Sequence, residues 1–115
     1  MDVTVRKENG ILVCALAGEI DLYAAPDFHA RYVTLSGQEP SCHFVFDLEK
    51  TTYIDSSGIG ILFKIYSDTR NRKANFCICN ANGMVKKIFF LSRMTQILPI
   101  EGDLPGAMAR VRNNA

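Results

Sequence analysis

The most chemically suggestive stretch of the chain is a run of small polar residues and glycines that stands between two apolar segments. It reads Asp55-Ser56-Ser57-Gly58-Ile59-Gly60. Asp and Ser side chains at such a position can cap the free N–H groups of a following helix. Glycine costs up to about 1 kcal/mol relative to alanine inside a helix. The glycines therefore indicate that another part of the fold, or a partner, comes close to this backbone.

Two catalytic interpretations of this run fail on spacing. A Walker-type phosphate loop needs GxxxxGK[ST], but the glycines here lead to Lys64 at the wrong spacing and with no hydroxyl residue after it. A nucleophilic serine of the GxSxG kind would need glycine where the chain has Ile54. A catalytic serine also needs a base, and both histidines, His29 and His43, fit structural positions.

A third interpretation treats a serine of this run as a substrate. A phosphate on a hydroxyl at a helix N-terminus gains from the helix dipole and from the free N–H groups of the first turn. A phosphoserine adds roughly −1.5 to −2 charges. A partner surface that lies over this end of the helix would then be repelled while the fold stays intact. The residues alone do not say which of the two serines is the acceptor.

Metal, redox and carboxylate chemistry find little support in the sequence. The four cysteines form no CxxC pair, have no histidine at zinc spacing, and are best explained as buried structural thiols. Asp47 and Glu49 stand two apart in an expected strand, where solvated acids at the strand end are the simpler explanation. We therefore expect no metal, no cofactor and no enzyme activity.

The composition is that of one small globular domain. The chain has 115 residues, of which 48% are hydrophobic and 22% charged, so residues 1–115 are expected to form a single domain. A net charge of +1 gives no global basic field for nucleic acid or anionic membranes. No apolar run approaches the roughly 20 residues of a membrane span. With no signal peptide at the start and no disulfide pattern, the expected location is the cytoplasm.

Strands and helices are expected to alternate along the chain, which predicts an α/β fold. The expected order is ββαβαβαβα, with a small mixed sheet of four to five strands and about four helices. Asn9-Gly10 predicts a hairpin turn between the first two strands. The dense β-formers of 43–48 predict a central strand. The expected strands are 3–6, 11–17, 43–48, 76–79 and a short edge strand at 97–98. The expected helices begin near Pro26, after Gly60, at Asn82-Gly83 with Val85, Ile88, Phe89 and Leu91 as its apolar side, and after Asp103.

The sequence resembles STAS domains of the anti-sigma factor antagonist type, from Val3 to about Ile100. The resemblance rests on motifs in the family's order. They are Gly18-Glu19-Ile20-Asp21, then Phe46-Asp47-Leu48 followed after six residues by Asp55-Ser56-Ser57-Gly58-Ile59-Gly60, then Val85-Lys86-Lys87-Ile88-Phe89. It implies the STAS fold and a partner-switching function. In that scheme the unphosphorylated antagonist binds an anti-sigma factor with a histidine-kinase-like ATPase fold, which releases the sigma factor. The ATPase phosphorylates the antagonist, which ends binding, and a PPM-type serine phosphatase reverses this.

The resemblance also implies the site residues. The family's phosphoacceptor directly follows the Asp, which is Ser56 here, and Ser57 is the second candidate. Asp21 lies in a loop that the family places near the acceptor, and it has either a partner role or a role in capping the first helix. Asp55 is either a cap or part of what the kinase recognises. The expected partner surface comprises Asp21, Asp55, Ser56, Ser57, Gly58 and Ile61. For Ile61, an exposed partner contact and a place on a wide buried face explain the sequence equally well.

The sequence is also compatible with other functions. A STAS domain can also serve as an accessory or scaffold subunit in lipid transport or in a stress-sensing assembly, without regulating a sigma factor. The intact Asp-Ser-Ser-Gly favours the phosphorylation switch over a scaffold. A small-molecule or nucleotide-binding domain is a weaker alternative, since it needs a pocket. The resemblance implies a monomer.

Overall fold

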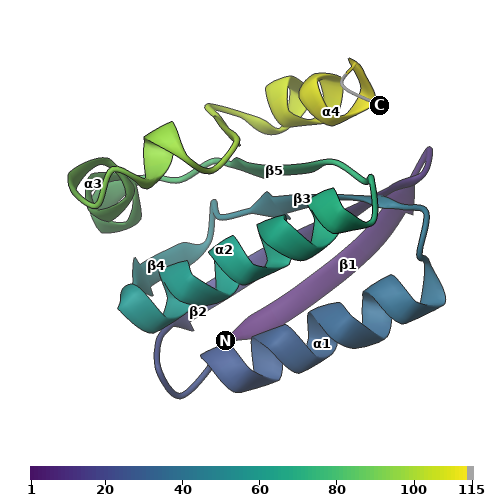
Figure 1. Ribbon diagram of the computed structural model, residues 1–115. Helices are drawn as coiled ribbons and strands as arrows, with labels where there is room; N and C mark the ends of the chain where they lie inside the picture. Colours follow the sequence, from purple (N-terminus) through teal and green to yellow (C-terminus); the bar gives the residue numbers. More distant parts are fainter. Residues whose placement is uncertain (114–115) are drawn as a thin grey trace.

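A computed structural model shows an α/β fold and describes residues 1–113 (Figure 1). The strands are β1 (Asp2–Glu8), β2 (Ile11–Ile20), β3 (His43–Asp47), β4 (Thr51–Ile54), β5 (Phe76–Cys79) and β6 (Ile100–Glu101). The helices are α1 (Ala25–Gln38), α2 (Ser56–Asn71), α3 (Gly83–Leu91), the 3₁₀ turn η1 (Met94–Gln96) and α4 (Leu104–Asn113). The predicted α/β class is confirmed.

The first two strands form the predicted hairpin. Asn9 and Gly10 have φ angles of 51° and 78°, which is the left-handed backbone that a two-residue hairpin turn requires. Glu8 pairs with Ile11 across the turn, and the antiparallel ladder continues to Asp2 and Ala17. The remaining strands pair in parallel, in the order β1-β2-β3-β5-β6. The predicted central strand is therefore confirmed as β3.

The sheet has one layer of helices on each face (Figure 1). Alternate strand residues such as Leu16, Phe44 and Ile78 pack with α1 and α2 in the larger core. The residues between them, such as Val45 and Cys77, pack against α4 in a smaller core. α3 lies at one end of the sheet, where it packs beside β4.

Two expectations about the strands are corrected. The sheet has six strands, because Thr51–Ile54 pairs with the end of β2 as a strand that the sequence pattern did not reveal. The short edge strand is at Ile100–Glu101 and not at 97–98. The N–H groups of Ile97 and Leu98 donate to the carbonyl of Met94 within a turn, and so they are not available to a sheet.

One expectation about α3 is also wrong. Leu91 was expected on the apolar side of this helix, but 71% of its surface is exposed. Val85 and Phe89 form the face that packs into the core, and they are fully buried. Leu91 lies on the opposite side of this short helix, since it follows Val85 by six residues and Phe89 by two.

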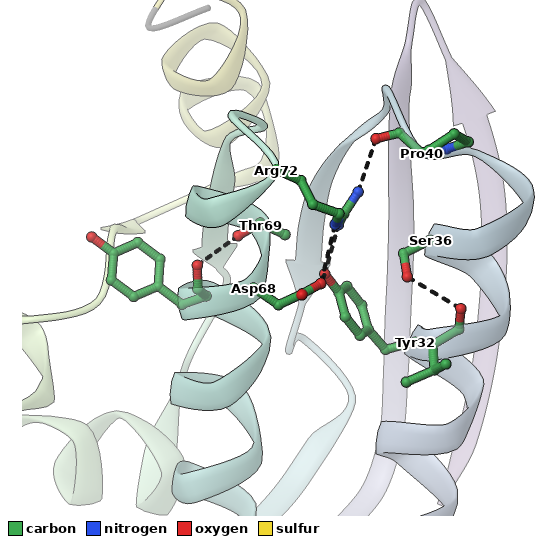
Figure 2. A network of polar contacts seen from close by, with 8 residues as sticks. Tyr32, Ser36, Pro40, Asp68, Thr69 and Arg72 are labelled. Atoms are coloured by element: carbon green, nitrogen blue, oxygen red, sulfur yellow. Dashed lines mark hydrogen bonds and ion pairs between the residues drawn. The ribbon is translucent and has the colours of Figure 1, made fainter.

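A polar network fixes α2 against α1 at the end remote from the serine run (Figure 2). The Tyr32 hydroxyl donates to the Asp68 carboxylate at 2.5 Å. Arg72 donates to the Tyr32 hydroxyl oxygen at 2.6 Å and to the Asp68 carboxylate at 3.1 Å. Arg72 also donates to the carbonyl of Pro40 at 2.9 Å. Burial, together with the bond to Asp68, raises the pKa of Tyr32 to about 12. The hydroxyl therefore keeps its proton, and the network holds α2 in a fixed position.

Candidate functional site

Asp55 begins α2 as its N-cap. Its backbone is extended, with φ −110° and ψ −174°, and its Oδ1 accepts a hydrogen bond from the N–H of Gly58 at 3.0 Å. The capping role predicted for Asp55 is confirmed. The helix starts at Ser56, so the whole serine and glycine run lies within its first two turns.

The two glycines of the run have different roles. Gly58 is buried, and a Cβ there would overlap the carbonyl oxygen of Ile20 and lie 2.7 Å from the side chain of Ile54. α2 can therefore pack onto the ends of β2 and β4 only because residue 58 is glycine. A Cβ at Gly60 would meet nothing within 4 Å. The fold itself explains the first glycine and not the second.

The loop between β2 and α1 is held beside the start of α2. The N–H of Leu22 donates to Asp55 Oδ2 at 3.0 Å. Asp21 Oδ1 accepts from the N–H groups of Tyr23 and Ala24 at 3.0 and 2.9 Å. The N-cap of α1 is Ala24, so Asp21 stabilises the turn that leads into the helix and does not cap the helix itself. Asp21 and Asp55 together fix the shape of this loop.

The structure brings most of the predicted site residues together at this end of the molecule. Ser56 is exposed, whereas Ser57 is half-buried and Gly58 is buried. Ile61 is half-buried and packs against the larger core. Of the two serines, Ser56 is the more exposed residue.

Three large exposed apolar residues near this end of the molecule were not predicted from the sequence. Leu22 and Tyr23, in the loop that Asp55 holds, have exposed fractions of 62% and 86%, and Tyr53 on β4 has 40%. Leu22 is bonded to Asp55 through its N–H, and Tyr53 comes three residues before Ser56 in the chain. Exposed large apolar side chains are typical of interaction sites. The signal in the sequence was the pair Leu22-Tyr23, two large apolar residues in a loop directly after Asp21.

An acidic hollow adjoins this surface. It has a volume of about 490 Å³ and lies beside Tyr23. Its lining includes the acidic side chains of Glu19, Asp21 and Asp27. The hollow beside the loop between β2 and α1 therefore carries negative charge.

The described residues contain neither a cluster of metal ligands nor a reactive thiol. Within residues 1–113, no group of three or more His, Cys, Asp or Glu side chains is arranged to hold a metal ion. The cysteines are free and buried, and burial raises the pKa of Cys14 and Cys79 to about 12 and of Cys77 to about 11. Thiols with such pKa values stay protonated and are poor nucleophiles near neutral pH. Among the helices of this part of the chain, none is long and apolar enough to span a bilayer.

Comparisons with known proteins agree with this geometry. Residues 2–107 match the family model described as STAS domain. The anti-sigma F factor antagonist of Paenibacillus polymyxa is 25% identical over 112 residues, which cover 96% of this chain and 95% of that protein.

Two solved structures show the same fold. An anti-sigma factor antagonist from Mycobacterium paratuberculosis has a TM-score of 0.85 at 22% identity, covering 96% of this chain and 93% of that one. The Bacillus cell fate determinant SpoIIAA in its phosphorylated form has a TM-score of 0.72 at 19% identity, covering 96% and 99%. Since the family model spans nearly the whole sequence, this chain belongs to the STAS domain family.

Proposed function

We propose that this chain is an anti-sigma factor antagonist controlled by phosphorylation of Ser56. Its unphosphorylated form binds an anti-sigma factor of the histidine-kinase-like ATPase fold, and the sigma factor is released. The observation that carries the proposal is that Ser56 is exposed at the first residue of α2, next to the loop that carries the exposed residues Leu22 and Tyr23. The names of the relatives support the same function.

The chemistry of the switch is phosphoryl transfer to a serine. The Ser56 Oγ attacks the γ-phosphorus of ATP held by the anti-sigma factor, the bond to the bridging oxygen breaks, ADP leaves, and the hydroxyl gives up its proton. A PPM-type phosphatase restores the hydroxyl by hydrolysis. In this scheme the antagonist is a substrate with no reaction of its own, acts as a monomer, and works in the cytoplasm, where sigma factors and ATP are found.

The position of Ser56 suits a switch that changes binding without changing the fold. A phosphate there meets the favourable N-terminal end of the α2 dipole. Both carboxylate oxygens of Asp55 are already engaged by N–H groups, so the helix start and the neighbouring loop keep their bonds. The added charge of roughly −1.5 to −2 then lies in the middle of the contact surface, where it repels a partner fitted to a neutral hydroxyl.

Phosphorylation with purified components tests the proposal. Each histidine-kinase-like ATPase encoded by the source genome is incubated with this protein and Mg²⁺–ATP, and the product is mapped by mass spectrometry. We expect one ATPase to add a single phosphoryl group at Ser56. Ser56→Ala abolishes the modification, and Ser57→Ala, the matched control one residue along, leaves it. Modification at Ser57 would contradict the choice of acceptor. Modification by none of the ATPases would favour the accessory or scaffold role in another system.

A further inference from the structure

α3 presents a second apolar face to solvent. Val85 and Phe89 are buried in the core, but Met84, Phe90 and Leu91 expose 56%, 71% and 71% of their surfaces. A helix of a small domain normally turns polar residues outward. Three large apolar side chains on the outer side of a nine-residue helix therefore indicate a contact surface.

The same outer face is positively charged. Between Asn80 and Ile100 the charged residues are Lys86, Lys87 and Arg93, and this stretch contains no Asp or Glu. All three cations are exposed. Lys86 and Lys87 precede the two exposed side chains of Phe90 and Leu91 by four residues each, so each lysine lies one turn from an apolar neighbour on the helix surface. We call Met84, Lys86, Lys87, Phe90 and Leu91 the α3 face.

α3 lies beside the strand that leads to Ser56. α3 packs beside β4, and the Asn82 side chain donates to the carbonyl of Glu49 at 3.1 Å in the turn that leads into β4. β4 carries Tyr53 and runs directly into Asp55 and Ser56. In Figure 1, α3, β4 and the start of α2 all lie at the same end of the molecule. In the same view, the start of α2 lies between α3 and the loop that joins β2 to α1, and this loop contributes to the acidic hollow.

We propose that the α3 face is a docking surface for an apolar segment flanked by acidic residues on the same anti-sigma factor that phosphorylates Ser56. This rests on the proposed function and adds the chemistry of the partner. The basic charge selects an acidic segment and raises the association rate, whereas Phe90 and Leu91 supply the buried apolar contact.

The distribution of charge favours an acidic protein partner over a second copy of this chain and over an anionic membrane. A second copy that packed α3 against α3 would bring Lys86, Lys87 and Arg93 of both copies together with no acid from that stretch. An anionic membrane that covered this end would also meet the acidic hollow, where Glu19, Asp21 and Asp27 repel it. A partner protein can be acidic opposite α3 and basic opposite the hollow.

Affinity measurements with the ATPase that phosphorylates Ser56 test the α3 face. Lys86→Glu/Lys87→Glu is expected to raise Kd at least roughly tenfold at low salt, chiefly through slower association, and the difference shrinks as salt is added. Phe90→Ser/Leu91→Ser is expected to raise Kd by a similar factor, chiefly through faster dissociation, with little dependence on salt.

A matched control changes the same net charge elsewhere. Lys73 and Arg112 are exposed, and they lie at the far end of α2 and on α4. Lys73→Glu/Arg112→Glu is expected to bind like the unmodified protein. Thermal melts of all variants are expected to match it as well, because the altered α3 side chains lie outside the core.

Each contrary outcome has a separate meaning. If both α3 variants bind as well as the unmodified protein while Ser56→Asp does not bind, the α3 face is overturned and the proposed function stands. If no ATPase binds the unmodified protein, both proposals fail. Two further outcomes would overturn the proposed partner, in each case if the α3 variants bind the ATPase as well as the unmodified protein does. Binding to phosphatidylserine vesicles that depends on Lys86 and Lys87 would indicate a membrane. A dimer in light scattering that the α3 variants abolish would indicate a second copy of this chain.

Discussion

Asp55 accepts a hydrogen bond from the backbone N–H of Leu22 at 3.0 Å, although the two residues are 33 positions apart in the sequence. The other oxygen of the same carboxylate caps α2 at Gly58. One side chain therefore sets both the start of the helix that carries Ser56 and the position of the exposed loop residues beside it. Stability and the shape of the site are linked at this point.

Replacing Asp55 tests this link. Asp55→Ala loses both hydrogen bonds and is expected to lower the free energy of unfolding by about 1–2 kcal/mol. Asp55→Asn keeps one carbonyl oxygen as an acceptor, so it retains the cap and is expected to lose less. Urea unfolding measures the stability, and limited chymotrypsin cleavage at Tyr23 measures how firmly the loop is held. An Asp55→Ala protein as stable and as resistant to cleavage as the unmodified chain would contradict the role of Asp55.

The two glycines provide a matched pair of variants in one helix. Gly58→Ala forces a Cβ against the carbonyl of Ile20 and is expected to cost about 2–4 kcal/mol, or to prevent folding. Gly60→Ala meets open space and is expected to raise the free energy of unfolding by up to about 1 kcal/mol. Denaturant unfolding measures the free energy of unfolding of both variants. Equal effects would show that close packing does not explain Gly58.

His43 predicts a pH dependence of stability. Burial lowers its pKa from the ordinary value of 6.5, and its Nδ1 accepts a hydrogen bond from the N–H of Asn75 at 2.8 Å, which needs the unprotonated nitrogen. Below pH 6.5 the unfolded chain therefore binds more protons than the folded one at this residue. The contribution of His43 is complete above that pH and is lost as the pH falls through 6.5 toward the lower pKa of the folded state.

The measurement compares the free energy of unfolding at about pH 8 and about pH 5. His43→Gln keeps an acceptor for the Asn75 N–H and cannot titrate in this range. It is expected to lose less stability on acidification than the unmodified chain. The same loss in both proteins would assign the pH dependence to other groups.

The network around Tyr32 separates stability from function. Tyr32→Phe removes the hydroxyl that joins Asp68 and Arg72 and is expected to lower the free energy of unfolding by about 1 kcal/mol. Asp68 lies twelve positions from Ser56 in the same helix, or about 18 Å along it. The rate of Ser56 phosphorylation in the folded protein is therefore expected to stay unchanged. A slower rate at a temperature where the variant is fully folded would show that this end of α2 affects the site.

Local patterns predicted much of the fold. Asn9-Gly10 fixed the hairpin through its positive φ angles, and the β-formers of β3 indicated a strand buried on both faces. β4 was not predicted because only Thr51 and Ile54 of its four residues are buried. This pattern is too short to distinguish a strand from a loop. β6 was misplaced because the turn at Met94 takes up the N–H groups of Ile97 and Leu98, a tertiary detail that no local pattern reveals.

The cap of α2 was predictable from the sequence, and the arrangement of the surface around it was less so. Asp55 could be identified as a cap from residue type and position alone. The hydrogen bond to Leu22 depends on two segments that meet only in the folded sheet. The exposure of Tyr53 depends on β4, which the sequence did not show. Leu91 follows Ile88 by three residues, which suggested a shared apolar side, but its spacing from the buried Val85 and Phe89 places it on the solvent side of α3.

The most direct test compares the affinity of the ATPase for this protein before and after phosphorylation of Ser56. The unphosphorylated form is expected to bind tightly and to release a bound sigma factor from the ATPase. The phosphorylated form is expected to bind at least roughly a hundredfold more weakly, because an added charge lies unpaired in the contact. Equal affinities for the two forms would contradict the switch at Ser56.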